Sequence, residues 1–151
     1  MAEIASRQST NVAANKKVMP TDAHGRRRSI IITTPATFTA ALNDTMGSGA
    51  VIPAGARFTA DSWVSCAAGA ASSTLSIGIR DPKTLAAIDA TAIASGVAIS
   101  SAANVAANNG TKVAAGIEYV TTQPVEVYAT FTGATPQANQ AIRIEVEYIL
   151  D

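Results

Sequence analysis

The 151-residue sequence has few of the side chains on which catalytic and metal-binding sites depend. It contains one cysteine, Cys66, and one histidine, His24. A single cysteine cannot form an intramolecular disulfide, and these two residues are too few for a zinc site built from cysteines and histidines. We therefore expect neither a bound metal nor a cofactor.

Charged side chains and long apolar runs are scarce as well. Asp, Glu, Lys and Arg make up 15% of the chain, against roughly 25% in typical soluble domains. No apolar run reaches the roughly 18 residues of a membrane-spanning helix. Residues 1–17 lack the apolar segment of a secretory signal. These absences predict that the protein neither enters a membrane nor uses the secretory route.

The abundant residues are small or branched at Cβ. The chain has 32 Ala, and its 25 Val and Ile residues far outnumber its 4 Leu. Branching at Cβ suits a pleated sheet and restricts χ1 in a helix. The composition therefore favours strands over helices.

Charge is distributed unevenly along a chain whose formal net charge is zero. Residues 1–29 carry six basic and two acidic side chains, and residues 30–151 carry five basic and nine acidic ones. We predict an extended basic N-terminal arm over 1–29 and a folded body over 30–151. Such an arm is either a solvated tail or binds an acidic protein surface or a nucleic acid. The absence of aromatics from the arm disfavours nucleic acid. The candidate binding residues are Arg7, Lys16, Lys17, Arg26, Arg27 and Arg28.

The body alternates between apolar and polar residues at the spacing of β-strands. This pattern is clear over 57–66 and 74–80 and in three segments near the C-terminus, 117–122, 125–132 and 142–148. Turn residues separate these segments, as expected for antiparallel strands with one buried face. We predict an all-β fold: a jelly-roll-like antiparallel β-sandwich of seven or eight strands.

One short helix is predicted within this sandwich. Asp81 can cap its start, Pro82 suits its first position, and Leu85 and Ile88 lie three residues apart on one face. Residues 89–110 show no clear period, and their structure cannot be predicted from the sequence.

Trp63 and Tyr128 are the candidates for contact with another subunit or a partner. Trp63 and Phe58 fall on opposite faces of the 57–66 segment, so one of them faces the core and the other the solvent. If Trp63 points outward, it marks a contact with another subunit or protein; in the reverse register, Phe58 is the exposed ring. We favour the first alternative. Tyr128 also falls on the predicted outer face of its strand.

The residues that could support catalysis are poorly arranged for it. His24 lies in the arm and lacks a scaffold that could position it. Cys66 shares the face of Phe58 and Val64, where a free cysteine behaves as a small apolar side chain. Glu145 and Glu147 lie about 7 Å apart on one strand face, in a row with Arg143 that is typical of a charged surface. We therefore predict no catalytic residues and no enzymatic activity.

Several segments together resemble the capsid decoration (cement) proteins of tailed bacteriophages. They are VIPAGARF, the TLSIG strand, the Asp-Pro turn followed by an alanine-rich segment with ASGVA, and PVEVYATFTGATPQANQAIRIEVEYI. The resemblance covers residues 50–151. It implies a sandwich on the outer capsid surface, a terminal arm that contacts the major capsid protein, and self-association as a homodimer or homotrimer. The protein would then reside in the host cytoplasm before assembly and in the virion afterwards.

Two alternatives belong to other functional classes. A glycan- or receptor-binding module of a head fibre or tail would use surface side chains such as Trp63, Tyr128, Glu145 and Glu147. A nucleic-acid-condensing protein would bind DNA through the basic arm with a steep dependence on salt. The low aromatic content argues against the first alternative.

Overall fold

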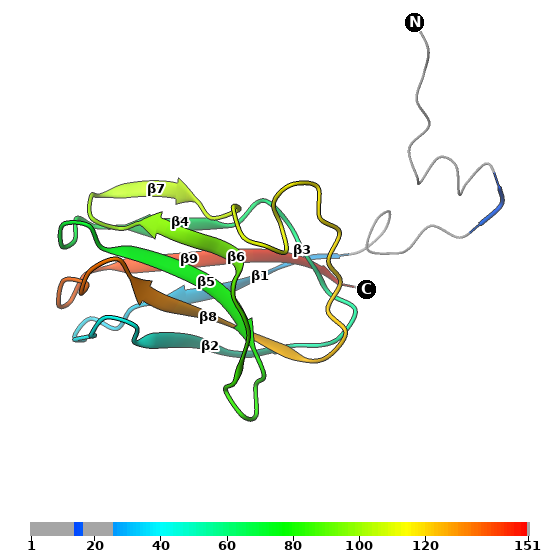
Figure 1. The fold of residues 1–151 in the computed structure, drawn as a ribbon, viewed down its shortest axis with the longest axis horizontal. Coiled ribbons are helices and arrows are strands. Elements are labelled where there is room, and N and C mark those ends of the chain that lie inside the picture. Colours follow the sequence, from blue (N-terminus) through cyan, green and yellow to red (C-terminus); the bar gives the residue numbers. More distant parts are fainter. Residues whose placement is uncertain (1–13, 17–25, 151) are drawn as a thin grey trace, which may run out of the picture.

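Two antiparallel β-sheets packed face to face make up the body of the protein (Figure 1). The structure is a computed structural model and describes residues 14–16 and 26–150. The predicted all-β antiparallel sandwich is confirmed. Its strands are β1 (Arg26–Thr33), β2 (Thr45–Ile52), β3 (Arg57–Phe58), β4 (Trp63–Cys66), β5 (Thr74–Arg80), β6 (Ala87–Ala98), β7 (Ala103–Ala106), β8 (Val125–Thr132) and β9 (Ile142–Leu150).

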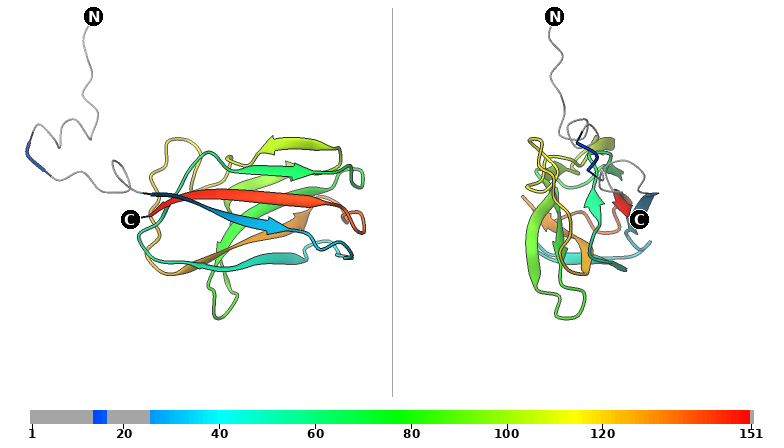
Figure 2. Two further views of the ribbon diagram at one scale, coloured as in Figure 1. Left: turned by 180° about the vertical axis from the view of Figure 1, so that it is seen from behind. Right: turned by 90° about the vertical axis from the view of Figure 1, so that its right-hand side faces the viewer.

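The strands divide into a five-stranded sheet A and a four-stranded sheet B. Sheet A has the order β1-β9-β4-β7, with β3 also paired to β9, and sheet B has the order β2-β8-β5-β6. Figure 2 shows the two layers from behind and from one end. Apart from the β5–β6 hairpin, neighbours in each sheet come from distant parts of the sequence, so long-range pairings define the fold.

The core lies between the sheets and consists mainly of Ile and Val. In sheet A the register aligns Ile32, Ile144 and Val64 in one inward-facing row. In sheet B, which forms the opposite layer of the core, Ile77 pairs with Ala129. All five side chains are at most 4% exposed. Branched side chains fill this interior, as the composition predicts.

The predicted strand 57–66 is interrupted, although its alternation is retained. Phe58 pairs with Tyr148 and Trp63 pairs with Glu145, so the chain between β3 and β4 has two residues more than β9 opposite it. Because two is an even number, the alternation of inward and outward side chains continues across the interruption. Phe58 therefore points inward, and Trp63 points outward.

The helix predicted after Asp81 is absent, and no helix occurs among the described residues, membrane-spanning or otherwise. The segment 81–86 is the loop of the β5–β6 hairpin. The Asp81 side chain accepts hydrogen bonds from the N–H groups of Lys83 and Thr84, both at 2.8 Å. Leu85 then adopts a φ of 58°, which no right-handed helix contains. Asp81 caps a turn here rather than a helix.

The strand predicted over 117–122 is also absent; this part of the chain is an irregular segment with one isolated bridge, between Val120 and Arg57. Thr121 is 2% exposed, and its hydroxyl contacts the Ala56 N–H and the Pro53 carbonyl. These side-chain bonds tie the segment to the loop before β3, in place of a sheet ladder.

Residues 89–110, which the sequence left unassigned, contain most of β6, all of β7 and an unusual bulge. Ile77 pairs with Ala94 and Ile79 pairs with Asp89, so residues 90–93 lie opposite the single residue Gly78. The β6 backbone passes so close to Gly78 that no Cβ would fit there.

The backbone carbonyls of this bulge are hydrogen-bonded to a following segment of the chain, residues 110–112. The N–H groups of Gly110, Thr111 and Lys112 donate to the carbonyls of Ile93, Thr91 and Ala92, at 2.9, 3.0 and 2.8 Å. A bulge of four residues leaves no continuous alternation in the sequence, which is why periodicity could not identify β6.

Candidate interaction surfaces

An exposed row of side chains crosses the outer face of sheet A. The register aligns Ile31 of β1, Glu145 of β9, Trp63 of β4 and Ala106 of β7. Ile31 is 47% exposed and Trp63 is 50% exposed. Large apolar side chains on a flat sheet face are typical of protein contact sites. The outward direction expected for Trp63 is confirmed. Ile31 was not singled out from the sequence, although the alternation within SIIIT places it on this face.

Ion pairs lie beside this row, and one of them includes its member Glu145. Arg27 contacts Asp61 and lies 3.4 Å from Glu147, and Arg143 lies 3.6 Å from Glu145. The Asp61 hydrogen bond, with the nearby Glu147 carboxylate, raises the pKa of Arg27. The outer face of sheet A, which we call the Trp63 face, therefore presents two exposed apolar side chains, Ile31 and Trp63, on either side of Glu145 and with ion pairs around them.

The basic residues assigned to the arm lie in different places. Arg26, Arg27 and Arg28 belong to β1, where they are exposed and pair with the last residues of β9. Lys16 is exposed, whereas Arg7 and Lys17 lie outside the described residues, as does His24. Whether Arg26–Arg28 act together with the preceding segment as an arm stays a prediction.

Tyr128 lies on the outer side of sheet B but is only 4% exposed. The register places it between Gly47 of β2 and Gly78 of β5, two positions without side chains. The Arg80 guanidinium lies over its ring, 5.1 Å from the centroid. Burial raises the pKa of the Tyr128 hydroxyl. Almost all of its surface is therefore covered within the chain, which leaves little for a partner to contact.

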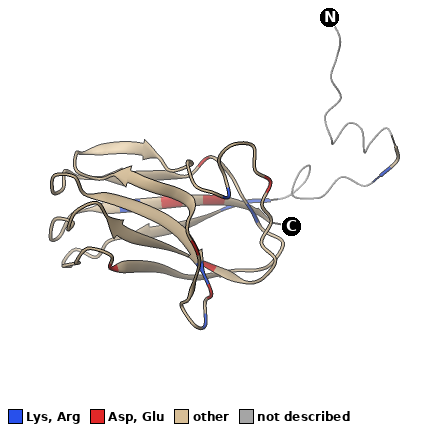
Figure 3. Cartoon of the chain, in the orientation of Figure 1, with Lys and Arg blue, Asp and Glu red and all other residues tan. Residues whose placement is uncertain are grey.

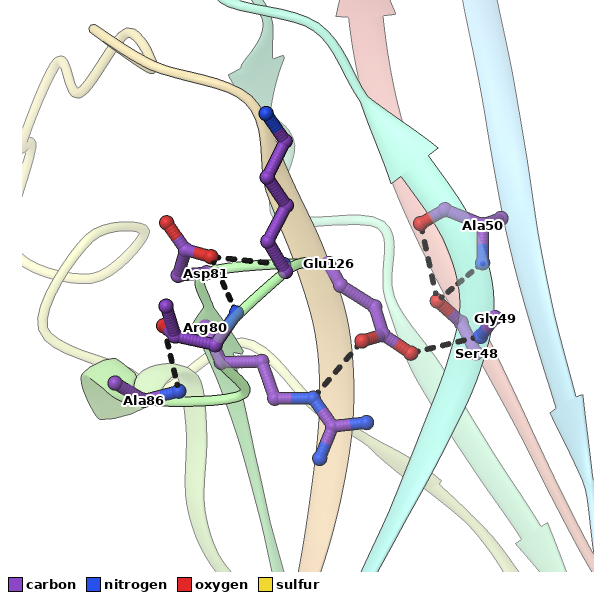
Figure 4. A network of polar contacts seen from close by, with 9 residues as sticks. Ser48, Gly49, Ala50, Arg80, Asp81, Ala86 and Glu126 are labelled. Atoms are coloured by element: carbon purple, nitrogen blue, oxygen red, sulfur yellow. Dashed lines mark hydrogen bonds and ion pairs between the residues drawn. The ribbon is translucent and has the colours of Figure 1, made fainter.

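Arg80, which covers the Tyr128 ring, also forms a largely buried ion pair with Glu126; Figure 4 shows this pair. Arg80 Nε donates to Glu126 Oε2 at 2.9 Å, and the Gly49 N–H donates to Glu126 Oε1 at 2.8 Å. The side chains of Arg80 and Glu126 are 12% and 7% exposed. The hydrogen bond from Arg80, together with the one from Gly49, lowers the pKa of the Glu126 carboxyl. This network joins β2, β8 and β5, and its role is structural.

The two ends of the sandwich differ in charge (Figure 3). The loops at the end where β2 and β5 begin are residues 34–44, 67–73, 99–102 and 133–141, and Asp44 is their single charged residue. Gln140, 4% exposed, fixes these loops by donating to the carbonyls of Ala67 and Ile99 at 2.8 and 2.7 Å. We call this region the uncharged end.

Two concave sites lie at the uncharged end. A cavity of about 320 Å³ lies between β1, β4 and β9, where Cys66 is 8% exposed. A groove of about 390 Å³ has a mixed lining, apolar at Pro35, Phe38, Ala40, Met46 and Phe131 and polar at Thr39, Asp44 and Thr45. The Phe38 and Phe131 rings stack with centroids 6.0 Å apart.

Among the described residues, the side chains considered for catalysis do not form a reaction site. The Cys66 thiol is buried and donates to the Ser101 carbonyl at 3.4 Å. Glu145 and Glu147 are each engaged by an arginine. Within 14–16 and 26–150, no three His, Cys, Asp or Glu side chains are close enough to hold a metal ion.

Comparisons with known proteins support the fold. No protein-family model and no curated protein matches the sequence. Among solved structures, the chain is similar to a chain of the cyanophage Pam1 capsid asymmetric unit. The match covers 100% of both chains with a TM-score of 0.57 and 16% identity. At this identity the similarity shows a shared fold.

Proposed function

We propose that this protein is a structural component of a phage capsid that binds the outer surface of the shell and cements it. In this role it bridges neighbouring major capsid subunits, acts without catalysis, and assembles as a homodimer or homotrimer. The observation that carries the proposal is the full-length similarity to a chain of the cyanophage Pam1 capsid asymmetric unit. The resemblance of residues 50–151 to decoration proteins points the same way.

The Trp63 face is the surface that suits contact with the major capsid protein. It combines the exposed apolar side chains of Ile31 and Trp63 with ion pairs formed at the surface. Burying Trp63 would remove a half-exposed aromatic surface from water, and aromatic anchors dominate binding at protein interfaces. A protein that binds only the mature shell stabilises that state by mass action.

The basic N-terminal residues add a second contact. Arg7, Lys16 and Lys17 precede β1, which begins at Arg26. Positive side chains at Arg7, Lys16 and Lys17 would pair with acidic groups on neighbouring capsid subunits. Such pairs contribute more to the rate and specificity of association than to affinity.

The test is co-sedimentation with matching capsids assembled without this protein. We expect saturation at a fixed copy number per shell and a higher melting temperature of the shell. Trp63→Ser should weaken binding at least about tenfold. Val51→Ser is the matched control, because Val51 is 59% exposed on the edge strand of the other sheet. Deletion of residues 1–25, which leaves β1 whole, should also weaken binding.

The outcomes separate the candidate functions. No co-sedimentation of the wild-type chain contradicts the capsid proposal. A specific signal on a glycan array would then favour the receptor-binding alternative. That alternative has less support, because Tyr128 is covered and Glu145 and Glu147 are engaged by arginines.

A further inference from the structure

The β5–β6 hairpin loop, residues 81–86, projects from the sandwich (the green loop at the bottom of Figure 1). Its shape is held by its own hydrogen bonds. The Leu85 N–H donates to the Asp81 carbonyl at 3.0 Å, and the Asp81 N–H donates to the Ala86 carbonyl at 2.9 Å. With the two bonds that the Asp81 carboxylate accepts, the loop presents a defined surface.

Leu85 is poorly suited to this position if the loop serves only as a turn. Its φ of 58° lies in the left-handed region, which glycine and asparagine adopt at lower cost than leucine. Its side chain is 56% exposed, so packing within the chain does not offset that cost. Backbone strain is often retained where it serves a function, and the exposed side chain leaves Leu85 accessible to a partner.

The neighbours of Leu85 extend the apolar surface. Ala86 and Ala87 are exposed, and Ile88 is 39% exposed. Lys83 is the one cation in this segment. We call residues 83–88 the Leu85 knob. It is an apolar projection with a single positive charge beside it.

The groove at the uncharged end offers apolar side chains beside one negative charge, with Thr39 and Thr45 as further polar lining. Pro35, Phe38, Met46 and Phe131 contribute its apolar lining, and Asp44 is the charged residue among the side chains that line it. Its volume, about 390 Å³, is large enough for a leucine side chain and its neighbours.

The knob and the groove lie at opposite ends of sheet B. Thr45 of β2 and Ser76 of β5 both pair with Thr130, so β2 and β5 start at the same end. The groove lies at that end, and the knob follows the far end of β5. One copy therefore cannot fill its own groove, whereas a second copy can.

We propose that the Leu85 knob of one copy docks into the groove of a second copy, with Leu85 against Phe38 and Met46 and with Lys83 facing Asp44. The knob and the groove would interact through apolar contacts and one pair of opposite charges. The contact forms twice in an antiparallel dimer, or once per protomer in a closed ring. This contact is the surface through which the proposed capsid component would associate with itself. Its role in a virion rests on the proposed function.

The test is the oligomeric state of the full chain without capsids, measured by analytical ultracentrifugation. Leu85→Gly should weaken self-association at least about tenfold. It should leave the melting temperature of the monomer unchanged or raised, because glycine is unstrained at this φ. Opposite changes in association and stability distinguish a contact residue from a folding residue. Val51→Gly is the control, an exposed apolar residue outside both surfaces.

A cross-linking experiment tests the same contact independently. Leu85→Cys and Met46→Cys variants, each prepared separately, should form an intermolecular disulfide when mixed and oxidised. Leu85→Cys mixed with Val51→Cys should not form one. The native Cys66 is buried and does not compete.

Three results would overturn the proposal. They are a wild-type chain that is monomeric at about 1 mM, self-association that Leu85→Gly leaves unchanged, and cross-linking equal to the control. A monomeric chain that binds capsids through Leu85 would assign the knob to the capsid protein instead. Failure of the wild-type chain to bind capsids bears on the proposed function alone.

Discussion

The outer faces of the two sheets carry similar sequence patterns but differ in exposure. Each face presents an aromatic residue on a strand inside its sheet: Trp63 on β4 of sheet A and Tyr128 on β8 of sheet B. Trp63 is 50% exposed, whereas Tyr128 is 4% exposed. Alternation along one strand gives the direction of a side chain but not what covers it.

The neighbours across the strands explain the difference. Trp63 stands between Glu145 and Ala106, which do not cover an indole ring. Tyr128 stands between two glycines, and Arg80 lies over it. The outer face of sheet B is therefore covered by the chain itself around Tyr128, whereas that of sheet A leaves Trp63 available for contact.

The largest expected effect tests the buried ion pair of sheet B. Glu126→Ala should lower the free energy of unfolding by about 3–5 kcal/mol, because it leaves Arg80 buried without its partner. The matched substitution on sheet A, Glu145→Ala, should cost less than about 1 kcal/mol. Urea denaturation of both variants measures the difference, and equal losses would remove the distinction between the faces.

A smaller effect is expected at Tyr128. Tyr128→Leu keeps an apolar side chain but removes the ring below Arg80, and should cost about 1–2 kcal/mol. The measurement is the same urea denaturation. A neutral result would mean that the ring only fills space and that the guanidinium gains nothing from it.

Acid should weaken sheet B in a way that depends on Glu126. The folded-state pKa of this carboxyl group is lowered, chiefly by Arg80. Its contribution to stability is therefore present above the unfolded value of about 4.3. It is lost as the pH falls from there through the lower folded-state pKa. The wild-type chain should lose more stability than Glu126→Gln between about pH 6 and pH 2. Parallel curves for the two proteins would assign the acid sensitivity to other carboxylates.

The smallest effect on stability is expected at Trp63. Trp63→Ser should change the free energy of unfolding by less than about 0.5 kcal/mol, as is usual for exposed positions, while weakening capsid binding. A large loss of stability would show that the indole packs against its own sheet, and Trp63 would then resemble Tyr128.

The sequence predicts the elements that depend on local pattern and fails where distant segments meet. The alternation in residues 142–148 correctly predicts a half-buried strand, and Trp63 is correctly placed outside. Asp81 and Pro82 predict a helix start, but the hydrogen bonds of Asp81 close a hairpin loop instead. Tyr128 is covered by Arg80, 48 residues away, and no local pattern contains that contact. Gly47 and Gly78 were the available signals, since a glycine inside a strand marks a close approach.

The bulge of β6 has a consequence for proteins that crowd together at high local concentration. A straight, unpaired edge strand can recruit another copy and grow into an aggregate. At residues 91–93 the outward backbone carbonyls are already occupied by the N–H groups of residues 110–112. The bulge that covers Gly78 therefore also prevents residues 91–93 from pairing with a further strand. Neighbouring copies cannot extend sheet B by hydrogen bonds at this part of its edge.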